Sequence, residues 1–201
     1  MSRPMQRIDT IRRIVELTNV EDLFVTSIGA TVDDLWNLRH GDNVFFTTVL
    51  GSVSSTALGL ALALPHRRVI AIESDGSVLM NTGAMCTLGS ERPANLTIVV
   101  MDNGMYENIG GHPTHTAGET DLAAMASAAG CPDAVGTDDL EDFTGHFKRM
   151  LCDNQLGYLV ARIAAGVHPW PADKKKRSDG TEDKYRFLRY IERLERVRIH
   201  L

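Results

Sequence analysis

The stretch Arg68-Val-Ile-Ala-Ile-Glu-Ser-Asp-Gly-Ser77 contains the pattern that decides the fold of this chain. Its residues 69–72 are all apolar, as in a parallel strand that helices cover on both faces. The acidic turn Glu73-Ser-Asp-Gly-Ser77 follows that strand and leads into a helix-like segment. A strand that ends in such a turn is typical of an α/β sheet, whose ligands bind outside the carboxyl ends of the strands.

A second stretch repeats this pattern further along the chain. The apolar strand Asn95-Leu-Thr-Ile-Val-Val-Met101 is followed by the amide-bearing turn Asp102-Asn-Gly104. The spacing suits a strand–helix–strand unit, which would bring Asp75 and Asn103 to one edge of the sheet. A carboxylate and an amide oxygen are hard ligands that Mg²⁺ prefers, and Mg²⁺ usually binds together with phosphate oxygens. We therefore expect a metal–diphosphate site at this edge.

Apolar and polar segments alternate along the rest of the chain. Apolar residues at helical spacing predict an amphipathic helix over residues 5–18. Thr31 is expected to cap the next helix, whose first turn carries Asp33 and Asp34, because the helix dipole favours acids there. Further strands are predicted at residues 23–27, 44–48, 134–135 and 158–163, and further helices at residues 56–64, 82–91, 121–129 and, after a cap at 137–139, up to 151. This alternation predicts an α/β fold with an open, mostly parallel sheet and helices on both faces.

The composition changes after Gly166, and we predict a boundary there. Residues 1–166 are expected to form one domain, and residues 167–201 a linker and an amphipathic C-terminal helix. An apolar stripe predicts this helical tail, which packs either on its own domain or on another subunit. The basic run Lys174-Lys-Lys-Arg177 is interpreted as a solvated linker rather than as a binding patch.

The bulk composition limits the classes of function. The 201 residues carry a net charge of −5, so nothing recommends nucleic acid as a partner. The longest apolar runs are far shorter than a membrane span, and the N-terminus lacks the apolar segment of a signal peptide, so we expect no membrane association. The three cysteines, Cys86, Cys131 and Cys152, form no C-x-x-C pair, which argues against a zinc or iron–sulfur site. Widely spaced thiols fit a reducing cytosol, so a cytoplasmic location is expected.

Three stretches together carry a resemblance to a known family. Ser74-Asp75-Gly76, followed by Asp102-Asn103, resembles the thiamine diphosphate signature, a G-D-G turn closed by an N-N turn. Upstream, Gly51-Ser-Val-Ser-Ser55 is similar to the G-S-[Met/Ile]-G-x stretch that precedes this signature. Downstream, the run from Asn103 to Thr114 resembles the diphosphate-side loop of sulfopyruvate and phosphonopyruvate decarboxylases, where Y-x-x-x-G-G-x-P-T is typical. The similarity covers roughly residues 42–162 and implies the thiamine diphosphate-binding fold.

The resemblance implies a site for thiamine diphosphate and Mg²⁺. Asp75, the side chain of Asn103 and the backbone carbonyl of Met105 would ligate the metal. Gly76 and Ser77 would bind the diphosphate with backbone N–H groups and a hydroxyl at the start of a helix, where the dipole favours an anion.

The same resemblance implies further contacts with the cofactor from upstream and downstream residues. Gly51, Ser52 and Val53 would contact it, with the Gly51 carbonyl accepting a hydrogen bond from its amino group and Val53 lying beneath it. Val53 is shorter than the methionine or isoleucine that the family usually has there. Tyr106 is a further candidate for cofactor contact, with simple packing as the alternative.

Two histidines are candidates for catalysis. His112 and His115 lie in a polar, glycine-rich loop of the kind that covers a site. Imidazole titrates near neutrality, so either side chain could move a proton or bind a substrate anion. The alternative is a pair of loop histidines that face water.

The resemblance also implies that half of the active site lies elsewhere. Enzymes of this class activate the cofactor with a glutamate on a pyrimidine-binding domain, and this chain is too short to contain a second domain of that size. The chain would then be a β-type subunit that pairs with a pyrimidine-binding α-type subunit in a heterotetramer. The implied reaction is decarboxylation of a short anionic 2-oxo acid, sulfopyruvate or phosphonopyruvate, to an aldehyde. Alternatives are a carboligase of the acetolactate synthase type and a non-catalytic partner subunit that retains the fold.

Overall fold

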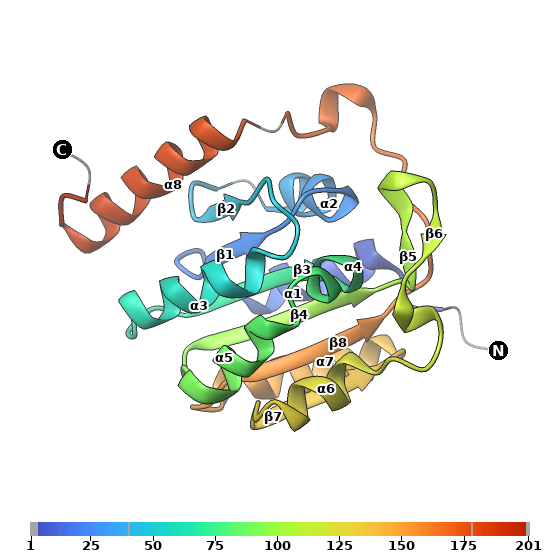
Figure 1. The fold of residues 1–201 in the computed structure, drawn as a ribbon. Helices are drawn as coiled ribbons and strands as arrows, with labels where there is room; N and C mark the ends of the chain where they lie inside the picture. The colour runs from blue at the N-terminus through green and yellow to red at the C-terminus, as the bar shows by residue number, and fades with distance from the viewer. Residues whose placement is uncertain (1–3, 40, 178, 200–201) are drawn as a thin grey trace.

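A parallel sheet forms the centre of the molecule in the computed structural model, which describes residues 4–39, 41–177 and 179–199 (Figure 1). Within the described residues the sheet has six strands in the order β2-β1-β3-β4-β8-β7, and every neighbouring pair is parallel. The strands are β1 (Leu23–Thr26), β2 (Val44–Phe46), β3 (Val69–Ser74), β4 (Leu96–Asp102), β7 (Asp133–Thr137) and β8 (Gly157–Arg162). The predicted α/β fold with a mostly parallel sheet is confirmed.

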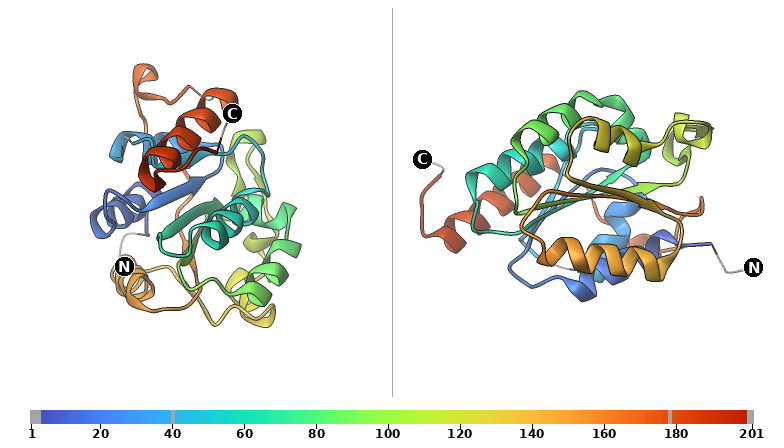
Figure 2. Two further views of the ribbon diagram at one scale, coloured as in Figure 1. Left: turned by 90° about the vertical axis from the view of Figure 1, so that its left-hand side faces the viewer. Right: turned by 90° about the horizontal axis from the view of Figure 1, so that it is seen from below.

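Helices cover both faces of this sheet (Figure 2). One face packs against α3 (Val53–Ala63), α5 (Gly83–Glu91) and α6 (Leu122–Ala128), and the other against α1 (Arg7–Leu17), α2 (Ala30–Leu38) and α7 (Leu140–Cys152). Successive side chains of a strand point to opposite faces, so Val69 and Ala71 enter one core while Ile70 and Ile72 enter the other. Both cores need apolar side chains, which explains the uninterrupted apolar run of β3.

The strand order reverses next to β1, and this reversal produces a crevice. The chain runs from β1 outward to the edge strand β2 and returns through α3 to β3 on the other side of β1. Connections that leave in opposite directions open a crevice at the carboxyl ends of the two strands. Ser74 of β3 pairs with Met101 of β4, so Asp75, which begins α4, and Asp102, the last residue of β4, lie at the same level.

The helix boundaries differ from the prediction at two points near this crevice. The prediction that Thr31 caps α2 is wrong, because Thr31 lies inside the helix and Gly29 occupies the cap position with φ +102°. A side-chain cap pattern could not reveal this start, since the turn depends on a backbone angle that favours glycine. Residues 73–77 are the end of a strand and the start of α4 (Asp75–Met80) rather than a free turn. Ser74 caps α4, since its hydroxyl accepts a hydrogen bond of 3.4 Å from the backbone N–H of Ser77.

The polar segment predicted as a loop has local structure of its own. Strands β5 (Met105–Tyr106) and β6 (His112–Pro113) form an antiparallel hairpin at the carboxyl ends of the large sheet (Figure 1). Short 3₁₀ turns follow each strand, at Glu107–Ile109 and at His115–Ala117. The hairpin gives the crevice a folded outer wall.

The C-terminal helix α8 (Gly180–Glu195) packs on its own domain, along the edge strand β2 (Figure 1). Phe187 and Ile191 are buried in the same core as α3, and the rings of Phe187 and Phe45 lie 5.5 Å apart. Of the two alternatives for this helix, the structure therefore shows contact with its own sheet, and the contact covers an otherwise open strand edge. The boundary predicted at residue 166 stays a prediction.

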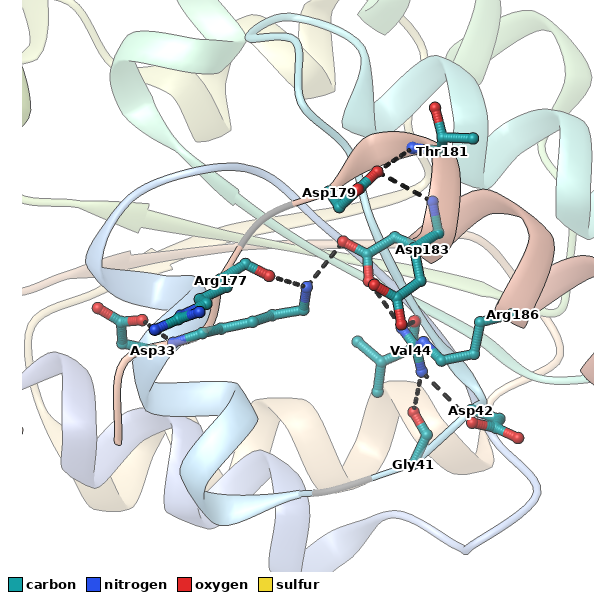
Figure 3. Close-up of polar contacts among 11 residues, drawn as sticks. Asp33, Gly41, Asp42, Val44, Arg177, Asp179, Thr181, Asp183 and Arg186 are labelled. Atoms are coloured by element: carbon teal, nitrogen blue, oxygen red, sulfur yellow. Dashed lines mark hydrogen bonds and ion pairs between the residues drawn. The ribbon is translucent and has the colours of Figure 1, made fainter. Parts of the chain in front are cut away.

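A buried lysine anchors the segment that leads into α8. The prediction of a solvated basic run is wrong for Lys176, whose side chain is 5% exposed and pairs with Asp183 at 2.7 Å. The Lys176 ammonium lies 4.6 Å from the centre of the Phe46 ring, which further favours its burial. Asp183 also binds Arg186, which donates to the carbonyls of Gly41 and Val44 (Figure 3). None of the helices in the described ranges is long and apolar enough to span a membrane.

Candidate functional site

A cleft with a cavity volume of about 100 Å³ lies where β1, β3 and β4 end. Its walls come from the segments after these three strands and from the hairpin. The lining includes Gly29, Gly76, Ser77, Asn103, Met105 and Tyr106. The structure therefore brings the two predicted turns together at the reversal of the strand order, where α/β sheets bind their ligands.

Asp75 is the buried carboxylate beside this cleft. It is fully buried, and its Oδ2 accepts hydrogen bonds from the hydroxyls of Thr114 at 2.6 Å and Thr116 at 3.1 Å. Its other oxygen, Oδ1, is buried without a hydrogen-bond partner. Burial raises the pKa of Asp75 and the charge of Asp102 raises it further, while the bond from Thr114 opposes both effects. A buried carboxylate oxygen without a partner costs free energy that a bound cation would offset.

Asn103 lies on the adjoining turn and lines the cleft. Its side-chain oxygen accepts a hydrogen bond of 3.0 Å from the backbone N–H of Met105, which leaves one lone pair for another partner. The turn is held by Asp102, whose Oδ1 accepts from the backbone N–H of Gly104 at 3.1 Å and from the hydroxyl of Thr116 at 2.6 Å. The Thr116 hydroxyl has one proton, which lies between Asp102 at 2.6 Å and Asp75 at 3.1 Å, and it therefore links the two turns.

These residues fit a magnesium ion that is shared with a diphosphate. Among the described residues, no group of three or more His, Cys, Asp and Glu side chains could hold a metal ion. The fit therefore depends on one carboxylate combined with amide and carbonyl oxygens, the donor set that Mg²⁺ accepts when phosphate and water complete its shell. Asp75, with its unpartnered oxygen, and the turn that carries Asn103 are linked through Thr116 and meet this requirement. The metal assignment itself stays a prediction.

Tyr106 packs directly against the first turn of α4. A side-chain carbon placed at Gly76 would overlap the Tyr106 ring, so glycine is required for this close approach. Both residues line the cleft. The packing alternative for Tyr106 is thus present in the structure, and its contact with a cofactor stays a prediction.

Sequence reasoning missed a buried glutamate beneath the site. Glu73 is 1% exposed, and its two carboxylate oxygens accept hydrogen bonds from the hydroxyls of Ser54 and, at 2.7 Å, Ser77. The Ser77 oxygen in turn accepts from the backbone N–H of Gly51 at 2.8 Å. Burial raises the pKa of Glu73, and the bonds from Ser54 and Ser77 oppose that shift. The available signal was the strand period, because Glu73 lies on the same strand face as the buried Ala71.

The upstream stretch lies beside the cleft rather than on its surface. Val53 is fully buried in the core, and neither it nor Gly51 nor Ser52 lines the cleft, whereas Leu50 does. The Gly51 carbonyl accepts a hydrogen bond of 2.8 Å from the side-chain amide of Asn81. Cofactor contacts of Gly51, Ser52 and Val53 stay predictions.

The two candidate histidines are exposed and do not line the cleft. His112 belongs to β6, and His115 begins the 3₁₀ turn that follows it. Thr114, between them, is the buried residue of this segment and reaches Asp75. The sequence offered no sign of that contact, since it depends on how the hairpin folds back over the sheet edge.

A family model described as thiamine pyrophosphate enzyme, C-terminal TPP binding domain, matches residues 29–161. This chain belongs to that family. The matched segment begins at the end of β1 and includes β3, α4, β4 and the hairpin, so it contains the turns that bear Asp75 and Asn103. Thiamine pyrophosphate is thiamine diphosphate, the cofactor that the resemblance implied.

Several proteins of this family are similar to the chain over most of its length. Sulfopyruvate decarboxylase subunit beta of Methanocaldococcus jannaschii is 35% identical over 158 residues, which are 78% of this chain and 83% of that protein. Phosphonopyruvate decarboxylase of Streptomyces viridochromogenes is 32% identical over 69% of this chain and 34% of its own length. Among solved structures, the thiamine diphosphate-dependent 4-hydroxybenzoylformate decarboxylase of Rhodococcus jostii RHA1 matches with a TM-score of 0.71 at 22% identity, over 83% of this chain and 34% of that one. The solved structure supports the fold alone, and the chain spans about a third of its length.

Proposed function

We propose that this chain is the β-type subunit of a thiamine diphosphate- and Mg²⁺-dependent decarboxylase. The substrate is a short anionic 2-oxo acid of the sulfopyruvate or phosphonopyruvate type, and the products are CO₂ and an aldehyde. The unpartnered, buried oxygen of Asp75, which Thr116 links to the turn that carries Asn103, carries the proposal. The similarity to sulfopyruvate decarboxylase subunit beta, which extends over 83% of that protein, supports the choice of substrate.

The residues of this chain would bind and orient the cofactor. Asp75, the Asn103 side chain and the Met105 carbonyl would hold Mg²⁺, while Gly76 and Ser77 would bind the diphosphate. When bound, thiamine diphosphate supplies an electron sink for the electrons that remain after loss of CO₂. Asp75, Gly76 and Ser77 are buried, and the low dielectric around them would strengthen their electrostatic contacts with the metal and the diphosphate.

The group that activates the cofactor would come from a pyrimidine-binding α-type subunit. The two glutamates nearest the cleft, Glu73 and Glu107, have both carboxylate oxygens engaged in hydrogen bonds. Glu73 does not line the cleft and Glu107 is held in an ion pair with Arg7, so the proposal places the activating group on the partner. A heterotetramer of two such pairs, in the cytoplasm, is part of this proposal.

An apolar rim around the cleft supports the presence of a partner. We define this rim as Ile28, Val49 and Ile109, of which Ile28 and Ile109 line the cleft and Val49 precedes the lining residue Leu50. The exposed fractions are 41% for Ile28 and 62% for each of the other two. Exposed apolar side chains grouped at a cleft mark an interaction site. His112 and His115, exposed on the hairpin, would face the substrate or the partner there.

The decisive experiment reconstitutes the enzyme. The purified chain and its α-type partner are mixed with Mg²⁺ and thiamine diphosphate, and CO₂ release is measured from sulfopyruvate, phosphonopyruvate and pyruvate. We expect turnover of one of the two dianionic acids at least tenfold above that of pyruvate, with an aldehyde as product. An acyloin product would replace the proposal with a carboligase, and no turnover with a verified partner would indicate a non-catalytic subunit.

A further inference from the structure

A cluster of charged side chains supports the outer wall of the cleft. Arg7, at the start of α1, and Glu107, directly after β5, both line the cleft. The Arg7 Nη1 lies 3.1 Å from Glu107 Oε2, although 100 positions separate the two residues in the chain. Both side chains are largely buried, with exposed fractions of 7% and 13%. Removing these two charges from water costs free energy, which the ion pair and its further hydrogen bonds have to offset. The partners of the two side chains therefore indicate what the pair does.

The same arginine binds two further groups. Its Nε donates to Asp34 Oδ2 at 3.1 Å, and its Nη2 donates to the backbone carbonyl of Gly166 at 2.7 Å. The second oxygen of Asp34 accepts from the indole N–H of Trp170 at 2.7 Å, and the second oxygen of Glu107 accepts from the backbone N–H of Gly166. The ion cluster of Arg7, Asp34 and Glu107 thus joins α1, α2, the hairpin and the segment after β8.

These contacts make a binding role for the cluster unfavourable. All three nitrogens of the Arg7 guanidinium are engaged, and one positive charge faces two carboxylates. An anionic substrate would therefore meet a net negative cluster. Both Glu107 oxygens already accept a hydrogen bond within the cluster, so the side chain is held there rather than presented to a substrate. What remains is control over the position of the segment that carries Glu107.

That segment contains the predicted metal ligands. Asn103 and Met105 precede Glu107 by a few residues on the same turn and strand, and their link is the hydrogen bond from the Met105 N–H to the Asn103 side chain. On the other side of Glu107, the Asn108 side chain lies directly against Gly29, the cap residue of α2. The segment 103–109 therefore contacts the start of α2 on one side and binds the ion cluster through Glu107 on the other.

We propose that Arg7 and Glu107 are positioning residues that fix the wall segment 103–109 at the cleft. Through this segment they set the place of Asn103 and Met105 relative to Asp75, a part of the inference that rests on the proposed function. Gly166 is the main-chain partner on the other side, because the cluster binds both its N–H and its carbonyl.

Two variants and a matched control test this proposal in the full chain. Glu107→Ala removes the carboxylate. Gly166→Ala acts through the backbone alone, since its φ is +127° and a side-chain carbon there would meet nothing within 4 Å. Glu195→Ala is the control, because Glu195 is a similarly buried glutamate that binds Arg67 and His66, each at 2.7 Å. That pair lies at the amino ends of the strands, near the end of α8 and away from the cleft (Figure 1).

Hydrogen–deuterium exchange of the chain without cofactor reads the wall directly. We expect exchange of the Met105 and Gly111 amides, which donate to the wall residues Asn103 and Tyr106, to become at least tenfold faster in Glu107→Ala and Gly166→Ala. Glu195→Ala should lower the melting temperature without changing these two amides. Unchanged exchange of the wall in both cluster variants would overturn the proposal. Glu107→Gln, which keeps the size of the side chain, replaces Glu107→Ala if that variant does not fold.

Cofactor binding separates positioning from plain stability. With the partner present, the Kd for thiamine diphosphate at saturating Mg²⁺ should rise about tenfold in both cluster variants and stay unchanged in Glu195→Ala. Faster amide exchange of the wall with an unchanged Kd would refute the claim that Arg7 and Glu107 set the place of the metal ligands. If the unmodified complex binds no thiamine diphosphate, the proposed function fails, while the exchange measurement still decides whether the cluster holds the wall.

Discussion

At the scale of single residues, Asp75 gives the sharpest prediction. Asp75→Asn keeps the shape of the side chain but removes the charge that a cation needs. We expect Mg²⁺-dependent retention of thiamine diphosphate to fall at least a hundredfold, as measured by equilibrium dialysis of the complex. The melting temperature of the chain without cofactor should stay the same or rise, because a buried charge with an unpartnered oxygen is removed.

The cysteines give a second prediction at this scale. Burial raises the pKa of the Cys131 thiol to about 11, and the residue is enclosed in the core, whereas Cys86 and Cys152 are exposed. Since the thiolate is the reactive form, a disulfide reagent at pH 8 should titrate Cys86 and Cys152 quickly and Cys131 only slowly. Stopped-flow absorbance measurements check this order of reaction. In denaturant, all three thiols should react at one rate. Fast reaction of Cys131 in the folded chain would contradict its burial.

A site residue could be predicted from the sequence when a strand end alone brings it to the cleft. Asp75 and Asn103 each follow an apolar strand, so parallel strand ends alone bring them to one edge. Thr114 and Thr116 reach Asp75 only because the hairpin folds back, and no local pattern encodes that return. Ser54 occupies the position of the second glycine in the G-S-[Met/Ile]-G-x stretch, and that comparison gave no sign that its hydroxyl binds the buried Glu73.

At the scale of elements, the attachment of α8 is open to a direct measurement. Lys176→Ala removes a buried partner of Asp183 and the contact with Phe46. Loss of one partner of a buried ion pair should lower the free energy of unfolding by about 3 kcal/mol, as measured by denaturant titration. Lys175→Ala, at an exposed neighbouring position, is the control and should change it by less than about 0.5 kcal/mol. Equal effects of the two substitutions would mean that the basic run is solvated after all.

The elements were predictable where periodicity is strong. The buried strands β3 and β4 and the helix α5 lie within a residue or two of their predicted ranges. The start of α2 was not predictable, because Gly29 opens it with a positive φ and no side-chain cap. The local order of the hairpin was also missed, since β5 and β6 have two residues each and leave no periodic signal.

At the scale of the whole molecule, the apolar rim predicts where the partner binds. Ile109→Asp places a charge on the rim and should weaken association with the α-type subunit at least tenfold, as measured by titration calorimetry. Val197→Asp is the matched control, because Val197 is also exposed but follows α8 at the opposite end of the sheet. The melting temperature of the isolated chain should not change in either variant. Equal affinity of the two variants for the partner would place the interface elsewhere.

Fold class and cofactor family were accessible from the sequence at this scale because both depend on strand ends and short motifs. The packing of α8 on its own sheet could not be predicted. An amphipathic stripe indicates that one face of a helix is covered, but it does not indicate which element covers it. Phe187 and Ile191 would bury equally well against a neighbouring subunit, and the choice depends on the distance that residues 167–179 span.

The ion cluster at the cleft has a consequence for anyone who wishes to trim the protein. The family-matched segment, residues 29–161, contains Asp34 and Glu107 but neither Arg7 nor Gly166. An excised minimal domain with those limits would keep two enclosed acids and discard the cation that neutralises them. Such a fragment would carry surplus negative charge beside the proposed site for the diphosphate. The segment that the family model matches is therefore shorter than the segment that contains the whole ion cluster.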